Sequence, residues 1–137
     1  MIIGIGTDIV NIDRIEKVLK RHGTRFLDRI FSADEQRFAA RMADRTGVLA
    51  KRWAAKEACS KALGTGMRQG VAWRDITVET GQGGMPLLHL RGRAHNRLLR
   101  LLPPGKAARL HLTMSDDRPC ATAFVIIEAV PRDGAMA

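Results

Sequence analysis

Apolar residues recur along most of the chain at spacings that predict its helices and strands. The segment from Ile2 to Val10 is an apolar run with glycines, which is typical of a buried strand that ends near Asp8. Apolar side chains at helical spacing follow it. They predict a helix that Asn11 or Asp13 can cap and that runs to about His22.

Two more helices are predicted in the first half of the chain. Ser32 and Glu35 form a capping-box pattern, so a helix is expected from there to about Met42. A longer helix is expected from about Gly47 to Leu63, and the turn Gly64-Thr65-Gly66 should end it.

The second half of the chain is predicted to be mainly strand. Residues 75–79 and 87–90 flank a turn rich in glycine and proline, and they predict two short strands. A helix is expected over residues 91–102, and the alternation over residues 110–114 predicts a half-buried strand. The apolar stretch from Cys120 to Ala129 predicts a strand that is buried on both faces or lies at a subunit contact. Together these elements indicate an α+β fold with a largely antiparallel sheet.

Composition agrees with a folded, soluble chain. It has 137 residues, of which 45% are hydrophobic and 27% charged, and we expect one domain over residues 1–130 and a loose tail over residues 131–137. The longest apolar run is too short to cross a membrane, and the N-terminus lacks the pattern of a secretory signal. Cys59 and Cys120 are expected to be free thiols, which indicates a cytoplasmic protein.

Positive charge dominates and is clustered. The formal net charge is +9, and basic side chains concentrate in residues 14–29, 37–61 and 91–109. Such clusters favour an anionic partner, which can be a nucleic acid, an acidic protein or a small polyphosphate, although a solvated basic surface is the alternative. Aromatic residues are only 4% of the chain, and this weakens the case for single-stranded nucleic acid, whose binding relies on aromatic stacking.

Asp8 is the first candidate for a chemical role. It closes the segment Gly6-Thr7-Asp8 at the end of the first predicted strand, where a carboxylate is well placed to bind a cation. The alternative is an aspartate that only caps a helix or supports a turn.

The second candidate group lies on the longest predicted helix. Trp53, Glu57 and Lys61 fall on roughly one face, and the plainest explanation of the last two is a surface ion pair. A neighbouring stripe carries Arg52, Lys56 and Ser60. The turn at residues 64–66 can offer backbone N–H groups to an anion, but the full P-loop pattern is absent.

These groups suit one chemistry if the first strand lies against this helix. Asp8 and Glu57 would then hold one Mg²⁺, an ion that prefers oxygen ligands and often binds one or two carboxylates plus a substrate phosphate. Basic side chains of the helix would neutralise further phosphate charge, namely Arg52, Lys56 and Lys61. Such a site suits transfer between phosphates.

At this level of detail the chain resembles a known family. The segments that carry the resemblance are Gly4–Val10, Arg14-Ile15, Phe31-Ser32 with Glu35, Trp53–Gly66, His111–Asp116 and Ala121–Ala123. They resemble bacterial holo-[acyl-carrier-protein] synthases, the short 4′-phosphopantetheinyl transferases, over about residues 1–130. The resemblance implies the fold of that family and a homotrimer with its active sites between neighbouring subunits.

The resemblance also implies a reaction and a set of residues. Phosphopantetheine would move from coenzyme A to a serine of apo acyl carrier protein, and adenosine 3′,5′-bisphosphate would be released. Asp8 and Glu57 would bind Mg²⁺, and Lys61 would contact phosphate or assist proton transfer, with a water near Asp8 as the rival base. Coenzyme A would be bound by Arg52, Lys56, Ser60, Lys61, Gly64, Thr65 and Gly66, and by Ser115 and Asp116 of the adjacent chain. Family members carry His or Asp at the last position, which leaves the general base open.

Acyl carrier protein is small and acidic, so a basic docking surface is expected. On the first predicted helix Arg14, Lys17 and Arg21 are spaced to share a face, with Arg25 just beyond and Phe26 as an apolar anchor. We therefore predict the carrier-protein surface there. Two other hypotheses are a basic nucleic-acid-binding module without catalysis and a relative that has lost activity and serves as a scaffold. The first leaves the two carboxylates unexplained, and the intact Asp8, Glu57 and Lys61 argue against the second.

Overall fold

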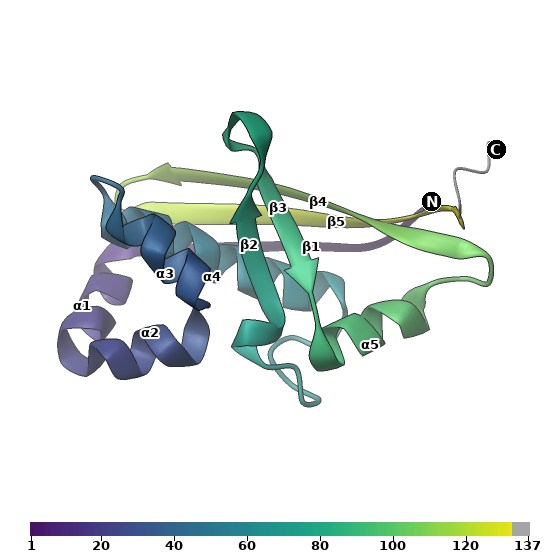
Figure 1. The fold of residues 1–137 in the computed structure, drawn as a ribbon, viewed down its shortest axis with the longest axis horizontal. Coiled ribbons are helices and arrows are strands. Elements are labelled where there is room, and N and C mark those ends of the chain that lie inside the picture. The colour runs from purple at the N-terminus through teal and green to yellow at the C-terminus, as the bar shows by residue number, and fades with distance from the viewer. Residues whose placement is uncertain (133–137) are drawn as a thin grey trace.

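The computed structural model describes residues 1–132 of the chain (Figure 1). The predicted tail over residues 131–137 lies outside the described residues from position 133 on. The elements, in chain order, are β1 (Ile2–Asn11), α1 (Ile12–His22), α2 (Thr24–Ile30), α3 (Ala33–Ala40), α4 (Arg45–Ala62), η1 (Trp73–Asp75), β2 (Ile76–Thr80), η2 (Gln82–Gly84), β3 (Pro86–Leu90), α5 (Gly92–Leu101), β4 (Lys106–Asp117) and β5 (Cys120–Pro131).

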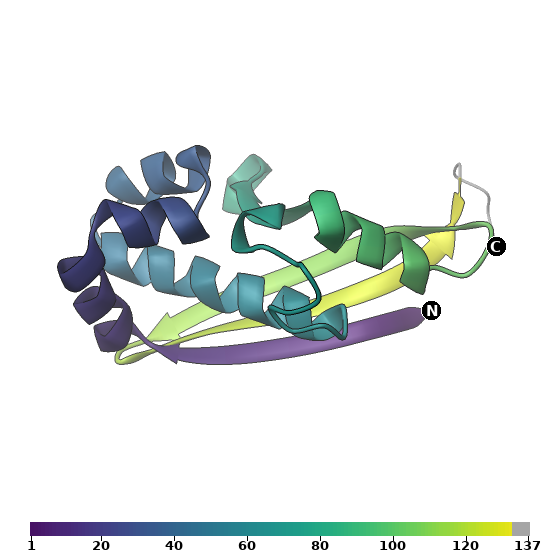
Figure 2. The same ribbon diagram turned by 90° about the horizontal axis from the view of Figure 1, so that it is seen from below.

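Two antiparallel sheets form the β part of the fold. One has three strands in the order β1-β5-β4, and the other is the hairpin β2-β3. Figure 2 shows α4 lying along one face of the three-stranded sheet, with the other helices and the hairpin on that same side. The expected mixed fold with antiparallel sheets is confirmed.

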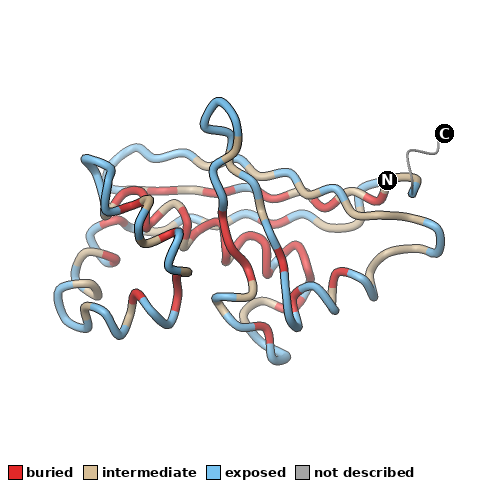
Figure 3. The backbone as a smooth tube through the Cα atoms, in the orientation of Figure 1, coloured by how far each residue is buried: buried red, intermediate tan, exposed pale blue. Residues whose placement is uncertain are grey.

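The core lies between α4 and the three-stranded sheet. Alternate residues of β5 are buried on the face toward α4, as the red segments of Figure 3 show, and they are Ala121, Ala123, Val125, Ile127 and Ala129. The residues between them, Phe124 among them, are half-buried or exposed. In the single chain β5 is therefore not buried on both faces, and only the expectation of a subunit contact remains open.

The uncovered face of this sheet carries several exposed apolar side chains among polar ones such as Thr7, His111 and Thr113. Strand register places Ile5 and Ile9 on the same side as Phe124, and these side chains are 60%, 65% and 41% exposed. Ile2, which is 62% exposed, pairs with Glu128 on that side too. We call Ile2, Ile5, Ile9 and Phe124 the open sheet face.

Two glycines allow β1 to approach α4 closely. A Cβ atom on Gly6 would lie 1.9 Å from the carbonyl oxygen of Ala58, and one on Gly4 would lie 2.2 Å from that of Ala62. No side chain fits in this space, so the backbone of the strand contacts the backbone of the helix. This contact sets where the side chains of β1 meet those of α4.

Local sequence signals explain most element boundaries. The Asn11 side chain caps α1 by accepting from two backbone N–H groups, and Ser32 and Glu35 complete the predicted capping box of α3. The short helix α2 was not predicted, and its N-cap is Gly23, which makes no side-chain cap. Strand β4 is longer than predicted because it pairs with β5 along its whole length. Within residues 1–132, no helix is long and apolar enough to cross a membrane.

Candidate active site

The close approach of β1 and α4 brings Asp8 and Lys61 together. Asp8 follows Gly4 and Gly6 at two-residue spacing, so its side chain points from the sheet toward α4. Lys61 Nζ lies 3.1 Å from Asp8 Oδ1 and also donates to the carbonyl oxygen of Thr7 at 3.0 Å. The Asp8 side chain is 15% exposed, so this carboxylate is partly shielded from water.

Glu57 stands beside this pair, one helical turn before Lys61. Its pKa is raised, first by burial of the carboxyl group and then by the negative charge of Asp8, while Lys61 acts in the opposite direction. Among residues 1–132, Lys61 forms an ion pair with Asp8 and none with Glu57. The alternative of a surface ion pair between Glu57 and Lys61 is therefore wrong. Two carboxylates and one ammonium group converge instead.

Two cavities meet at Glu57 and Lys61. One has a volume of about 580 Å³ and extends along the turn after α4, where Gly64, Thr65, Gly66, Met67 and Arg68 line it. The other, of about 390 Å³, includes Asp8 and Trp53 and reaches α1 and α2, where its lining includes Arg14, Val18 and Phe26. Glu57 thus lies where the two cavities meet, and Asp8 lines one of them.

The glycine turn does not offer free N–H groups to an anion, and that expectation was wrong. Gly64 N donates to the Lys61 carbonyl at 3.0 Å, while Thr65 N and Gly66 N donate to the Ser60 carbonyl at 3.2 and 3.1 Å. These bonds satisfy the carbonyl groups at the end of α4, and positive φ angles at the two glycines make the turn possible. The turn shapes the cavity and does not bind through its backbone.

Lys56 and Ser60 do not reach these cavities. Lys56 is fully buried, where its Nζ lies 2.9 Å from Glu35 Oε1, and Ser60 is fully buried with its hydroxyl donating to the Glu57 carbonyl at 2.7 Å. The sequence predicted that Lys56 would neutralise phosphate charge, and the family resemblance implied that both residues bind coenzyme A. They are part of the core because partners within the fold satisfy the ammonium group and the hydroxyl.

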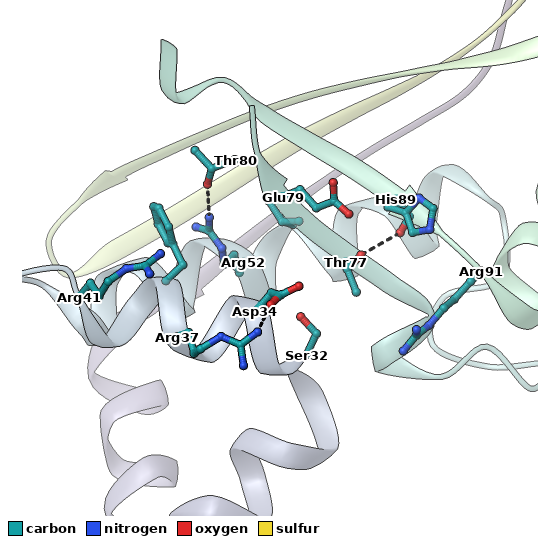
Figure 4. Close-up of a pocket in the computed structure, with 12 residues that line it drawn as sticks. Ser32, Asp34, Arg37, Arg41, Arg52, Thr77, Glu79, Thr80, His89 and Arg91 are labelled. Atoms are coloured by element: carbon teal, nitrogen blue, oxygen red, sulfur yellow. Dashed lines mark hydrogen bonds and ion pairs between the residues drawn. The ribbon is translucent and has the colours of Figure 1, made fainter. Parts of the chain in front are cut away.

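Arg52 opens into a third, basic cavity of about 680 Å³ between α3, α4 and the β2-β3 hairpin (Figure 4). Its Nη2 donates to Thr80 Oγ1 at 3.2 Å, and its Cζ atom lies 4.5 Å from the ring centre of Phe38. Its buried Nε has no hydrogen-bond partner among residues 1–132. Other charged or polar side chains of the lining include Arg37, Arg41, His89 and Arg91, with Asp34 and Glu79 as the acidic ones.

The guanidinium of Arg52 is short of acceptors. Arg52 is only 4% exposed, and burial lowers its pKa while the charge of Glu35 opposes that change. A buried cation with an unpartnered N–H group is costly unless an acceptor completes its shell. The basic cavity is therefore suited to an anion, and the arginines that α3 adds to it were missed at the sequence level because only the fold brings them to Arg52.

Ser115 and Asp116 lie apart from the Asp8 cluster in the single chain. Ser115 pairs with Thr122 on the side of the open sheet face, and its side chain is exposed. Asp116 Oδ1 lies 3.0 Å from Lys51 Nζ on α4. Neither residue lines the cavities beside Glu57.

The predicted docking residues lie on α1 and α2. Arg14, Lys17, Arg21 and Arg25 are exposed on α1 and α2. Phe26 is half-buried and stacks on Trp53 with ring centres 5.7 Å apart. Arg14 and Phe26 also line the cavity that contains Asp8, so this surface borders the carboxylates.

The Asp8 cluster fits a hard cation better than zinc. Within residues 1–132 no group of three or more His, Cys, Asp or Glu side chains could hold a metal ion. The two carboxylates alone provide oxygen ligands and leave the remaining positions to water and substrate, which is the arrangement typical of Mg²⁺. Cys59 is buried, with its pKa raised by burial to about 12, so it is a core thiol.

The chain is similar to known proteins over nearly its whole length. The sequence profile described as "4'-phosphopantetheinyl transferase superfamily" matches residues 4–123. A holo-[acyl-carrier-protein] synthase of Cereibacter sphaeroides is 56% identical over 132 residues, which is 96% of each chain, and one of Brucella ovis is 54% identical over 131 residues, or 96% of this chain and 98% of the relative.

Solved structures of holo-[acyl-carrier-protein] synthases are also similar to this chain. The holo-[acyl-carrier-protein] synthase of Neisseria meningitidis is 39% identical with a TM-score of 0.80, covering 93% of this chain and 99% of that one. The Helicobacter pylori enzyme in complex with coenzyme A is 32% identical with a TM-score of 0.77, covering 90% and 99%. The chain is therefore an enzyme that belongs to the holo-[acyl-carrier-protein] synthase family of the 4′-phosphopantetheinyl transferase superfamily.

Proposed function

We propose that this enzyme transfers the 4′-phosphopantetheine group of coenzyme A to a serine of apo acyl carrier protein and releases adenosine 3′,5′-bisphosphate. The observation that carries the proposal is the convergence of Asp8, Glu57 and Lys61 where two cavities meet. The relatives named above support the choice of substrates, since one of the solved structures contains coenzyme A.

Asp8 and Glu57 are the residues that would hold Mg²⁺. When bound, the ion would neutralise charge on the transferring phosphate and its leaving group. Lys61 is held at Asp8 by its ion pair, and its exposed ammonium group faces the cavity of the glycine turn. From there it can bind a phosphate oxygen or take part in moving the proton of the attacking serine hydroxyl.

The two ends of coenzyme A are proposed to occupy different cavities. The pantetheine arm would lie along the turn of Gly64, Thr65 and Gly66, and the phosphorylated nucleotide would lie in the basic cavity with Arg52. On α4, Arg52 and Glu57 are about 140° apart around the helix axis. One chain therefore presents its carboxylates and its basic cavity on different sides, and we propose that a neighbouring copy completes each active site.

The open sheet face is the proposed contact between copies in a homotrimer. Large apolar side chains gathered in the exposed state on one face of a sheet are typical of a surface that another protein covers. Ser115 faces the same side as this patch. An assembly through the patch would therefore place Ser115 near a second copy, as the resemblance to the family implies for Ser115 and its neighbour Asp116.

Acyl carrier protein is proposed to dock on the basic surface of α1 and α2, next to the cavity of Asp8. The acidic partner would be drawn to the arginines, and Phe26 would supply an apolar contact. We place the reaction in the cytoplasm, where free Cys59 and Cys120 are stable as thiols.

The direct test is incubation with apo acyl carrier protein, coenzyme A and Mg²⁺, followed by mass spectrometry of the carrier protein. A gain of one phosphopantetheine group is expected, and it should disappear with a chelator, in Asp8→Asn and in Glu57→Gln. The matched control is Asp13→Asn, because Asp13 is an exposed carboxylate outside the cavities. Full activity of Asp8→Asn with unchanged Mg²⁺ dependence would contradict the metal role.

A further inference from the structure

Glu35 is the buried carboxylate for which the proposed reaction has no use. We infer that Glu35, through its ion pair with Lys56, is a positioning residue that holds the walls of the basic cavity at the separation that binds the nucleotide end of coenzyme A. The inference rests on the proposed function, and it assigns to Glu35 no contact with substrate.

The contacts of Glu35 join three elements. Oε1 accepts from the backbone N of Ser32 at 2.8 Å and lies 2.9 Å from Lys56 Nζ. Oε2 accepts from the backbone N of Val78 at 2.9 Å. One carboxylate therefore links the start of α3, the middle of α4 and the centre of β2.

Lys56 extends this link to a fourth segment. Its ammonium group also donates to the carbonyl oxygen of Trp73 at 3.3 Å and to that of Ile76. The side chains of Lys56 and Glu35 are 0% and 1% exposed, so neither can exchange its partner for water. Together the pair fixes η1 and the first residue of β2 against α4.

The same elements build the basic cavity. The helix α3 contributes Arg37 and its C-cap residue Arg41, β2 contributes residues 77–80, and α4 contributes Arg52 one turn before Lys56. Ser32 and Val78, which donate backbone hydrogen bonds to Glu35, also line the cavity. In Figure 4, Arg37 and Arg52 reach into the space between α3 and β2. A change in the separation of these walls changes the site directly.

The charge of Glu35 is a second reason to connect it with anion binding in the basic cavity. Arg52 and Lys56 are two buried cations with one buried anion, Glu35, beside them. The negative charge of Glu35 acts on Arg52 in the opposite direction to burial, which lowers the pKa of the guanidinium. The excess positive charge is left for a bound anion.

A pair that only stabilised the fold would behave differently. Its loss would lower the melting temperature, as the loss of any well-packed core group does, but the folded enzyme would bind coenzyme A as before. The distinguishing quantity is therefore the KM for coenzyme A relative to the KM for the analogue that lacks the 3′-phosphate, dephospho-coenzyme A.

The test compares wild-type enzyme with Glu35→Gln, Glu35→Asp and Lys56→Met, each assayed well below its melting temperature. We expect the KM for coenzyme A to rise about tenfold or more in Glu35→Gln and Lys56→Met, because small misplacements of binding groups have large effects. The KM values for dephospho-coenzyme A and for apo acyl carrier protein should change less than about twofold. Glu35→Asp keeps the charge but shortens the reach, and an intermediate value is expected.

Ile127→Ala is the control, because Ile127 is a fully buried residue of β5 that does not line the basic cavity. It should lower the melting temperature and leave the preference for coenzyme A over its analogue unchanged. Equal changes with both substrates in the Glu35 and Lys56 variants, or none, would overturn the positioning role. If Glu35→Gln does not fold, Glu35→Asp and Lys56→Met decide the question.

The results for the wild-type enzyme distinguish a failure of the proposed function from a failure of the nucleotide assignment. If the wild-type enzyme transfers no phosphopantetheine, the proposed function is wrong and the inference falls with it. If it transfers the group but does not distinguish coenzyme A from dephospho-coenzyme A, the nucleotide assignment of the basic cavity fails while the reaction stands.

Discussion

Gly6→Ala tests whether the contact of β1 with α4 holds the active site together. The added Cβ atom would lie 1.9 Å from the Ala58 carbonyl oxygen and 2.8 Å from the Ala62 backbone nitrogen, whereas ordinary contacts begin near 3.4 Å. Both atoms belong to the helix backbone and cannot rotate away. The strand and the helix must therefore separate by about 1.5 Å, the difference between 1.9 and 3.4 Å.

Two measurements should report this separation. Overpacking of a core costs roughly 1–3 kcal/mol, and a clash with backbone should reach the upper end of that range, so the melting temperature should fall by on the order of 10 °C. Because Asp8 and Glu57 are carried by the two separated elements, kcat should fall by roughly 100-fold and the Mg²⁺ concentration for half-maximal activity should rise.

Gly105→Ala separates lost stability from lost geometry. Gly105 has a φ of 79°, and no atom of the described residues lies within 4 Å of an added Cβ, so its substitution is strained but displaces none of them. It should lower stability by about 1–2 kcal/mol and leave kcat unchanged. If Gly6→Ala kept the kcat and the Mg²⁺ dependence of the wild-type enzyme, the claim that β1 and α4 jointly position the carboxylates would be refuted.

Three further predictions concern the surface and the start of α4. Charge reversal at Arg14 and Arg21 should raise the KM for acyl carrier protein, most strongly at low salt, and leave the KM for coenzyme A unchanged, while Arg100→Glu on α5 should change neither. Ile5→Asp on the open sheet face should convert the proposed trimer into monomers in light scattering and abolish transfer, and a folded trimer would disprove that interface. The hydrogen bond from the Gly47 N–H group lowers the pKa of Asp44 below its ordinary value of 3.8. The negative charge of Asp44 therefore stabilises the fold at pH values above 3.8, and this stabilisation is lost as the pH falls through the lowered pKa. Asp44→Asn should cost about 0.5 kcal/mol at neutral pH, with the difference from wild type vanishing in acid-dependent unfolding curves.

Local patterns in the sequence predicted most of the elements because each has its own start and stop signals. The capping box at Ser32 and the side-chain cap at Asn11 form as their sequences require. Helix α2 was missed because it is seven residues long and begins after Gly23 without a side-chain cap. The spacing of its buried residues Leu27 and Ile30 was the available signal, but such a short run does not identify a helix by periodicity.

The functional site was predicted less evenly, and the failures have one cause. Sequence spacing reports neighbours on the same helix, so it paired Lys61 with Glu57 and grouped Lys56 with Arg52. In the fold Lys61 reaches Asp8 on β1, and Lys56 reaches Glu35, 21 residues earlier in the chain. A charged side chain takes the partner that the tertiary structure supplies, and no pattern within one element identifies that partner.

The tertiary structure places the excess positive charge of the chain in two different environments. Part of it lies on the surface of α1 and α2, where water and salt screen it and a protein partner can be attracted from a distance. Another part is buried in Arg52 and Lys56, where Glu35 balances only one of the two charges. The buried excess lowers the stability of the free enzyme, and an anion in the basic cavity would offset that effect. Anion binding in the basic cavity should therefore stabilise the fold more than anion binding at the docking surface, because the buried charge favours tighter binding and the stabilisation by a ligand of the folded state grows with the logarithm of its concentration divided by its Kd.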